Sequence, residues 1–165
     1  MGEPVRLMVD LPNDAAIVAL AVHDPEAEML LASNAGDGFL AKERDIAAQT
    51  RAGRQVLNVR GNVRLVAARR VDGDMVAAVG DNRKLLVFPL ADMPRMSRGK
   101  GVRIQKHKDD GLADARTFRS AEGLRWKDGG GRTRTERDLA DWTGPRGSTG
   151  RMAPRGFPRT NRFSD

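Results

Sequence analysis

Short apolar runs alternate with turns rich in glycine, asparagine and aspartate along most of the chain. The clearest case is the stretch from Met75 to Ile104, where an apolar run reaches Gly80-Asp81-Asn82 and a second run continues from Lys84 to Pro89. Glycine and asparagine tolerate the positive φ of a tight turn, and β-branched and aliphatic residues give the strands a face that packs. The pattern predicts a β-hairpin followed by a strand at 102–104, and a helix is the weaker interpretation.

This arrangement recurs, with a basic glycine loop at the end of each copy. Gly53, Gly99 and Gly147 occupy the same point in successive copies, at spacings of 46 and 48 residues. One small sheet cannot bury its own apolar face, so a hairpin repeat of this length is typical of a blade array. The sequence therefore predicts an all-β, open array of about three four-stranded blades over residues 1–142, with approximate repeats at 29–60, 75–106 and 124–152.

The segments between the repeats also predict strands and turns. Residues 5–11 alternate apolar and polar positions and 17–22 form an apolar run, so we expect strands in 1–28 that pair with the first blade. Residues 63–71 and 112–118 predict two more strands. Asp72-Gly73-Asp74 predicts a hairpin turn into Met75, and residues 105–111 are too polar for the core.

The last 23 residues differ in composition from the rest. Residues 143–165 contain five arginines, no lysine, three prolines and four glycines, with Met152, Phe157 and Phe163 as the large apolar side chains. Burial of so few groups offsets little ordering entropy. We therefore expect an extended, partly disordered basic tail, with Phe157 as the residue able to dock.

Composition excludes several chemistries. The chain of 165 residues has no cysteine, which excludes disulfides, thiolate catalysis and cysteine-based zinc sites. No apolar run approaches the roughly 20 residues that span a bilayer, and the first residues do not form a signal peptide. A cytoplasmic location is the expectation.

Charge is distributed unevenly. Residues 1–40 contain seven acidic residues and one arginine, whereas the whole chain carries +7, so residues 41–165 carry +13. Clustered cations attract polyanions such as nucleic acids and release their condensed counterions. A solvated arginine-rich surface is the alternative, because net charge describes partners and not fold.

The basic loops recur at one point of each repeat, which favours binding. We predict that they form a discontinuous track that contacts DNA phosphates without reading bases. The candidate residues are Lys42, Arg44, Arg51, Arg54, Arg95, Arg98, Lys100, Arg103, Lys106, Lys108, Arg132, Arg134 and Arg146.

Catalytic interpretations find little support in the residues. His23 and His107 are the two histidines, and Asp109-Asp110 beside His107 is flanked by lysine and glycine, which favours a turn over a metal site. The loop at 98–101 lacks the helix and Lys-Ser/Thr ending of a P-loop. Tyrosine is absent, so no tyrosine nucleophile comes from this chain. The aromatic residues Phe39, Phe88, Phe118, Trp126 and Trp142 fit core packing better than base stacking.

Three segments carry a resemblance to a known family. They are residues 2–8 (GEPVRLM), 36–39 (GDGF) with 48–59 (AQTRAGRQVLNV), and 96–102 (MSRGKGV) with 108–115 (KDDGLADA). These segments resemble the C-terminal domain of the A subunit of bacterial topoisomerase IV, a domain related to the C-terminal domain of gyrase A. The resemblance extends over nearly the whole chain, including 151–163.

The resemblance implies a β-pinwheel in which neighbouring blades exchange a strand, with further blades before residue 1. It implies a non-catalytic domain that binds and bends double-stranded DNA and recruits a segment for ATP-dependent strand passage, decatenation and relaxation. Ser97-Arg98-Gly99-Lys100-Gly101 resembles a degraded form of the basic glycine box of gyrase, which puts full gyrase-like wrapping in doubt.

The implied partners are duplex DNA, the rest of the topoisomerase IV A subunit, the B subunit and a regulator. The resemblance implies no membrane association and a location at the nucleoid in the cytoplasm. No cofactor is expected in this fragment, since ATP and Mg²⁺ act elsewhere in the enzyme. Two alternatives from other classes stay open: a protein-interaction module that docks a regulator through its acidic first region, and a free-standing enzyme.

Overall fold

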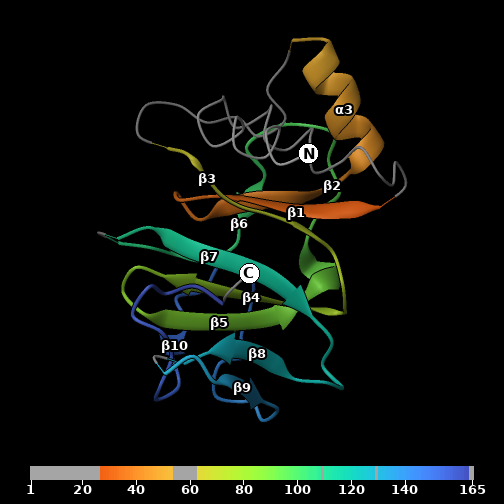
Figure 1. Cartoon of the computed structure of the whole chain (residues 1–165). Coiled ribbons are helices and arrows are strands. Elements are labelled where there is room, and N and C mark those ends of the chain that lie inside the picture. The colour runs from red at the N-terminus through yellow and green to blue at the C-terminus, as the bar shows by residue number, and fades with distance from the viewer. Residues whose placement is uncertain (1–26, 54–62, 109, 129, 164–165) are drawn as a thin grey trace.

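The architecture is all-β, as predicted. The structure, a computed structural model, describes residues 27–53, 63–108, 110–128 and 130–163. In these residues ten strands form three antiparallel sheets that are stacked in layers (Figure 1). The strands predicted at 5–11 and 17–22 lie outside the described residues.

The first sheet has the strand order β3-β1-β2-β6. Its strands are β1 (Glu28–Ser33), β2 (Asp37–Lys42), β3 (Leu65–Arg70) and β6 (Val102–Arg103). β1 and β2 form the predicted hairpin, in which Leu31 lies opposite Phe39. The strand predicted at 63–71 is present as β3, on the other side of β1.

The second sheet has the strand order β10-β5-β4-β7. Its strands are β4 (Met75–Gly80), β5 (Lys84–Pro89), β7 (Leu112–Phe118) and β10 (Arg151–Met152). β4 and β5 form the predicted hairpin, with Val79 opposite Leu85. The third sheet pairs β8 (Leu124–Lys127) with β9 (Thr133–Glu136) as an antiparallel hairpin. Within the described residues it has two strands and not the predicted four.

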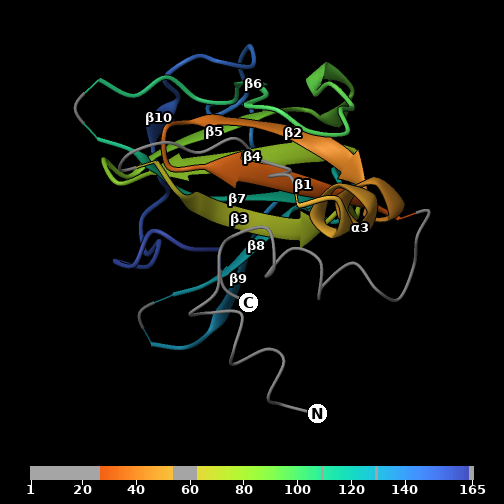
Figure 2. The ribbon, with the colours of Figure 1, turned by 90° about the horizontal axis from the view of Figure 1, so that it is seen from above.

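Neighbouring modules exchange their last strands. β6 follows the β4–β5 hairpin in sequence but pairs with β2 of the first sheet, and β10 follows the β8–β9 hairpin but pairs with β5 of the second. The exchange implied by the resemblance is therefore present. In Figure 2, β6 and β10 lie on one side of the stack and β3 and β7 on the other.

The turn predicted at Asp72-Gly73-Asp74 does not close a hairpin. β3 belongs to the first sheet and β4 to the second, so these residues connect two layers. Gly73 has φ of 131°, and a Cβ there would overlap the carbonyl group of Phe118. The glycine lets the connection run close to the end of β7.

Apolar side chains fill the space on both faces of the sheets. Leu30, Leu40 and Phe88 belong to the cluster shared by the first and second sheets, whereas Leu31 and Phe39 face the other side of the first sheet. A third cluster joins the second sheet to β8 and the last residues of the chain. Because both faces are covered, the strands read as continuous apolar runs and not as strict alternation.

A helix covers the outer face of the first sheet, and it was not predicted. α3 (Glu43–Arg51) follows β2 directly, in a region interpreted as strand and turn. Its Ile46 is fully buried in the cluster with Leu31 and Phe39. A second short element, the 3₁₀ helix η1 (Leu90–Asp92), leads out of β5.

The last segment packs on the second and third sheets, which contradicts the expected partly disordered tail for residues 143–163. Phe157 and Phe163 are 3% and 0% exposed, and their rings contact each other at a centroid distance of 5.6 Å. Phe157 also contacts Trp126 at 5.7 Å. The predicted docking of Phe157 is confirmed, and Phe163 forms a second anchor that gives the segment the burial it was expected to lack.

Candidate nucleic-acid interface

Residues 94–108, called the basic strap below, close the open edge of β2. The N–H of Leu40 donates to the carbonyl of Pro94 at 2.9 Å, and the N–H of Met96 donates to the carbonyl of Leu40 at 2.8 Å. Farther along, β6 pairs Arg103 with Asp37. The strap therefore follows the strand from Asp37 to Leu40, and its basic side chains are arranged along one edge of the sheet.

Glycine explains why the strap lies so close to β2. Gly101 has φ of +85°, and a Cβ on it would overlap the carbonyl group of Gly38. Gly38 in turn faces the carbonyl of Leu31 and the side chain of Ile104. The two backbones can approach this closely because neither position carries a side chain.

The strap carries six of the predicted phosphate-contacting residues: Arg95, Arg98, Lys100, Arg103, Lys106 and Lys108, and all six side chains are exposed. The Arg95 guanidinium pairs with the Glu28 carboxylate, which raises the pKa of Arg95. The Lys100 Nζ lies 3.9 Å from Asp37. Within the described part of the chain, Arg98, Arg103, Lys106 and Lys108 form no ion pair, so their charges face solvent.

The loop at 144–150 fixes the strap to the second sheet. Nη1 of Arg146 donates to the carbonyl of Arg103 at 2.8 Å, and the N–H of Lys106 donates to the carbonyl of Ser148 at 3.0 Å. Arg146, another predicted contact residue, is half-buried, so part of its guanidinium holds the strap in place.

Gln105 corrects the expectation that residues 105–111 lie outside the core. Its side chain is fully buried and its amide donates to the carbonyls of Lys84 and Thr149, at 2.9 and 3.0 Å. These bonds connect the strap, the start of β5 and the loop before β10. A polar residue is buried here because backbone carbonyls satisfy its donors.

His107 lies between the hairpin turns of the first two sheets. A Cβ on Gly36 would lie 3.0 Å from its ring, and a Cβ on Gly80 would lie 2.5 Å from its Cε1. Both ring nitrogens are buried without a hydrogen-bond partner in the structure. Burial lowers the pKa of His107, an effect that Asp81 and Asp110 oppose. The ring acts as packing between the sheets.

The other predicted contact residues lie on separate elements. Lys42 ends β2, and Arg44 and Arg51 lie on α3. Arg132 and Arg134 lie at the β8–β9 hairpin, where Arg134 pairs with Asp128 at 3.0 Å and lowers the pKa of that carboxyl. Arg54 lies outside the described residues. The structure thus brings together the strap residues and Arg146, and Lys42 lies opposite Glu28, the ion-pair partner of Arg95. Arg44, Arg51, Arg132 and Arg134 lie on other elements.

A second cationic edge, opposite the strap, was not predicted. It comprises Arg69, Arg70, Arg116, Arg119 and Arg125, from β3, β7, β8 and the β7–β8 connection. Arg69 pairs with Asp114, Arg70 with Glu43, and Arg119 with Asp72, at 2.9, 2.7 and 2.8 Å. These arginines lie within β3, β7 and β8 or directly after β7, and not in the repeated glycine loops, so the repeat pattern did not point to them.

The described residues contain no group of three or more histidine, cysteine or acidic side chains placed to hold a metal ion. They also contain no helix long and apolar enough to cross a membrane. The predicted aromatic residues pack as expected: Phe39, Phe88, Phe118 and Trp126 are buried, and Trp142 is half-buried with its indole N–H donating to the carbonyl of Met152.

Two solved structures with a similar fold are C-terminal domains of topoisomerases. The chain aligns with the C-terminal domain of E. coli ParC at a TM-score of 0.69 and 28% identity, over 83% of this chain and 59% of that one. It aligns with the C-terminal domain of DNA gyrase A at a TM-score of 0.59 and 17% identity, over 81% and 47%. The second likeness concerns the fold alone. The predicted pinwheel is thereby confirmed.

Curated relatives are similar to this chain over nearly its whole length. The A subunit of DNA topoisomerase 4 from Rickettsia bellii is 41% identical over 99% of this chain and 22% of its own length, and that of Caulobacter vibrioides is 40% identical over 98% and 21%. The chain thus spans about a fifth of these relatives. The family model for the DNA gyrase C-terminal domain, a beta-propeller, matches residues 27–72 and 74–115. The chain belongs to the DNA gyrase C-terminal domain family, and its full-length relatives are topoisomerase IV A subunits.

Proposed function

We propose that the chain binds and bends duplex DNA and recruits it for strand passage by topoisomerase IV. The observation that carries this proposal is the basic strap, because it aligns exposed cations along one sheet edge and is hydrogen-bonded to the neighbouring sheet through Arg146 and Gln105. Backbone phosphates are the ligands that such a sequence-independent row of cations suits.

Bending follows from the stacking of the sheets. A duplex that contacts both the strap and the cations of α3 or the β8–β9 hairpin has to extend across more than one sheet of the stack. The phosphate contacts would offset a bending cost of about 1–6 kcal/mol. DNA cleavage, ATP hydrolysis and Mg²⁺ binding would belong to the rest of the A subunit and to the B subunit, on the nucleoid in the cytoplasm.

The first test is the salt dependence of duplex affinity, measured by fluorescence anisotropy. The double variant Arg98→Ala/Lys100→Ala removes two exposed strap cations. If both contact phosphates, the slope of log K against log salt becomes shallower by about 1.8, since each neutralised phosphate contributes about 0.9. Affinity at low salt falls as well, equally for unrelated sequences.

The matched control is Arg155→Ala/Arg159→Ala, which removes the same charge from exposed positions of the last segment, outside the strap, α3 and the β8–β9 hairpin. Its slope should stay close to that of the unaltered chain. Equal slopes for the two double variants would show that net charge, and not the strap, governs binding.

A protein-docking role is the second candidate. Among the described residues β8 and β9 pair only with each other, so the exposed edge of β9 can accept a strand from another protein. Two results together would favour this role over DNA binding. The chain would capture a regulator and lose it on Thr135→Pro, and it would show no measurable duplex affinity at low salt.

A further inference from the structure

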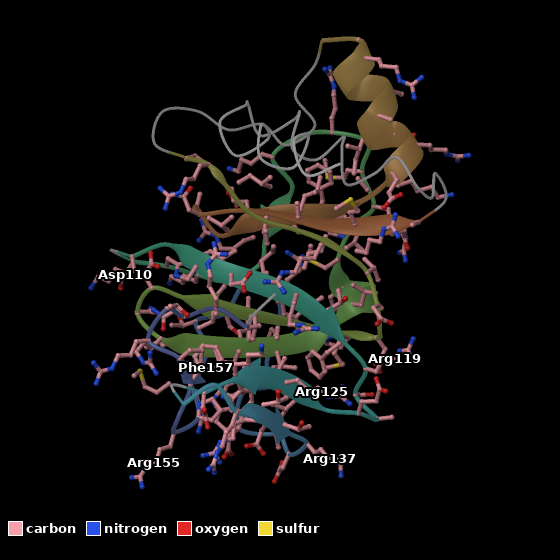
Figure 3. The ribbon with its side chains drawn as sticks, viewed as in Figure 1. Asp110, Arg119, Arg125, Arg137, Arg155 and Phe157 are labelled. Atoms are coloured by element: carbon pink, nitrogen blue, oxygen red, sulfur yellow. The ribbon has the colours of Figure 1, made fainter. Side chains whose placement is uncertain are left out.

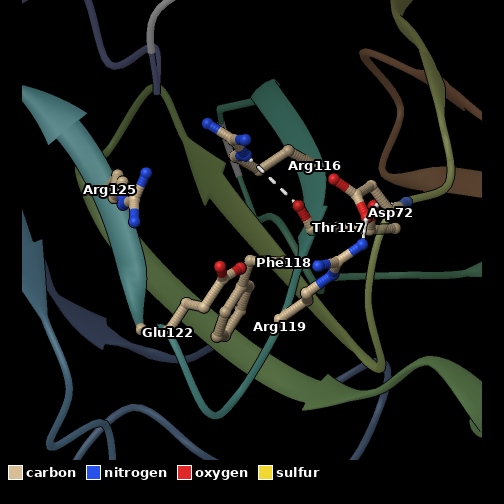
Figure 4. A pocket seen from close by; sticks show the side chains of 8 residues that line it. Asp72, Arg116, Thr117, Phe118, Arg119, Glu122 and Arg125 are labelled. Atoms are coloured by element: carbon tan, nitrogen blue, oxygen red, sulfur yellow. Dashed lines mark hydrogen bonds and ion pairs between the residues drawn. The ribbon is translucent and has the colours of Figure 1, made fainter.

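The cationic edge opposite the strap contains a small polar pocket (Figure 4). Its volume is about 110 Å³, and Arg116, Arg119, Glu122 and Arg125 line it together with Asp72. An adjoining hollow of about 280 Å³ shares Asp72 and Arg116 and extends toward β3. Figure 3 shows Arg119 and Arg125 on the same side of the molecule.

Arg116 is a half-buried cation of this pocket with few partners. It is half-buried on β7, and its Nε donates one long hydrogen bond of 3.3 Å to the carbonyl of Thr117. In the described residues no carboxylate forms an ion pair with it. Burial lowers the pKa of Arg116, and the nearby charges of Arg69 and Arg125 lower it further, against Asp114 and Asp72. A partly desolvated guanidinium with unused donors favours an anion.

The surrounding charges leave a positive balance. Arg119 is paired with Asp72 at 2.8 Å, which leaves the Glu122 carboxylate facing the guanidinium groups of Arg116 and Arg125. Arg125 is exposed on β8, and the described residues offer it no ion-pair partner. Figure 4 shows the side chains of Arg116, Glu122 and Arg125 around one open space.

We propose that this pocket binds a phosphate group, with Arg116 as the half-buried anchor and Arg125 as the second ligand. A tetrahedral dianion suits the site because the two guanidinium groups come from different strands and can each bind a separate pair of oxygens. The cavity has room for one such group. The phosphate belongs either to a small phosphorylated molecule or to a nucleic-acid strand.

The inference does not rest on the proposed function, because the strap lies on the other edge of the stack (Figure 2). Loss of DNA binding at the strap would leave the phosphate site in place. Loss of the phosphate site would leave the strap and its exposed cations in place.

The test uses inorganic phosphate as the probe and the ¹⁵Nε–Hε signals of arginine side chains as the readout, at constant ionic strength. The expected result is a saturable shift of the Arg116 and Arg125 signals. The exposed variant Arg125→Ala should weaken phosphate binding about tenfold, the usual effect of losing one charge-assisted contact. Arg137→Ala, an exposed control outside the pocket, should leave it unchanged.

Two further arms identify the source of the phosphate. If Arg125→Ala also makes the salt slope of duplex binding shallower by about 0.9, the ligand is a DNA phosphate. If a nucleoside monophosphate binds and the duplex slope is unchanged, the ligand is a small molecule. Shifts that do not saturate with phosphate, or that are the same in Arg125→Ala and the unaltered chain, would overturn the proposal.

Discussion

Gly101 shows, at the scale of single residues, how the basic glycine loop works. The sequence predicted that the basic loops contact phosphate, and the structure places Gly101 against Gly38 of β2. The glycine therefore positions its basic neighbours and need not contact DNA itself. Spacing in the sequence located the loop, but no local pattern reveals which backbone a glycine will approach.

The variant Gly101→Ala should detach the strap from β2. A Cβ would overlap Gly38 and strain the positive φ, and we expect a loss of about 1–3 kcal/mol in unfolding free energy together with weaker duplex binding. Gly131→Ala is the control, because Gly131 has a similar φ of +82° and open space around it. Thermal unfolding of the two variants separates the effect of the Cβ overlap with Gly38 from the effect of backbone strain at positive φ. Equal losses of stability in both variants would mean that the close approach of Gly101 to Gly38 is unimportant.

His107 makes stability depend on pH. Its pKa is lowered in the fold, mainly by burial, so the unfolded chain binds more protons as the pH falls through 6.5. The stability that depends on the neutral ring is therefore complete above pH 6.5 and is lost as the pH falls below it. The groups facing the ring from neighbouring elements are Asp81, Asp110 and Arg103.

The unfolding free energy of the variant His107→Gln should depend less on pH than that of the unaltered chain between pH 7 and pH 5.5. Urea unfolding at fixed pH values measures this difference, and His23→Gln gives the control for the second histidine. Parallel pH profiles for His107→Gln and the unaltered chain would contradict the account, because the buried ring would then contribute no linked proton.

At the scale of elements, hairpins could be predicted and partners of short strands could not. The β4–β5 hairpin was predictable because Gly80 and Asn82 mark a turn between two long apolar runs. β6 and β10 have two residues each, and their place is decided by edges that other strands leave open. The local sequence therefore does not predict which strand β6 or β10 pairs with.

The helix α3 and the last segment were misread for different reasons. α3 has acidic residues in its first turn and Arg51 in its last, a helix pattern that the repeat alignment obscured. The last segment was judged by its composition, but Arg83 of the β4–β5 turn binds it directly. The Arg83 guanidinium donates to the carbonyls of Phe157 and Pro158 and to Oδ1 of Asn161, at 2.8, 3.0 and 3.1 Å.

The variant Arg83→Ala should loosen the last segment without unfolding the sheets. We expect a loss of about 1–3 kcal/mol in unfolding free energy, because buried carbonyls lose a charged donor. Limited trypsin digestion should then cleave faster after Arg155 and Arg159, which are exposed. Arg162→Ala is a control at an exposed position of the same segment, and an unchanged digestion rate for Arg83→Ala would contradict the anchoring role.

At the scale of the whole molecule, cations lie on two opposite edges of one stack of sheets. The strap edge follows the predicted glycine loops, whereas the edge formed by β3, β7 and β8 was found only in the structure. The twelve predicted residues that the structure describes do not form one continuous arc, because those of α3 and of the β8–β9 hairpin lie on separate layers. Three-dimensional order, and not charge count, defines the DNA path that we propose.

Site-specific photo-crosslinking tests the proposed DNA path most directly. The chain has no cysteine, so Ser97→Cys on the strap and Ala121→Cys on the opposite edge each provide one attachment point for a crosslinker. Under conditions in which a duplex is bound, we predict crosslinks from position 97 that disappear as salt is raised. A bound duplex that crosslinks from position 121 and not from position 97 would contradict the proposal that DNA lies along the strap.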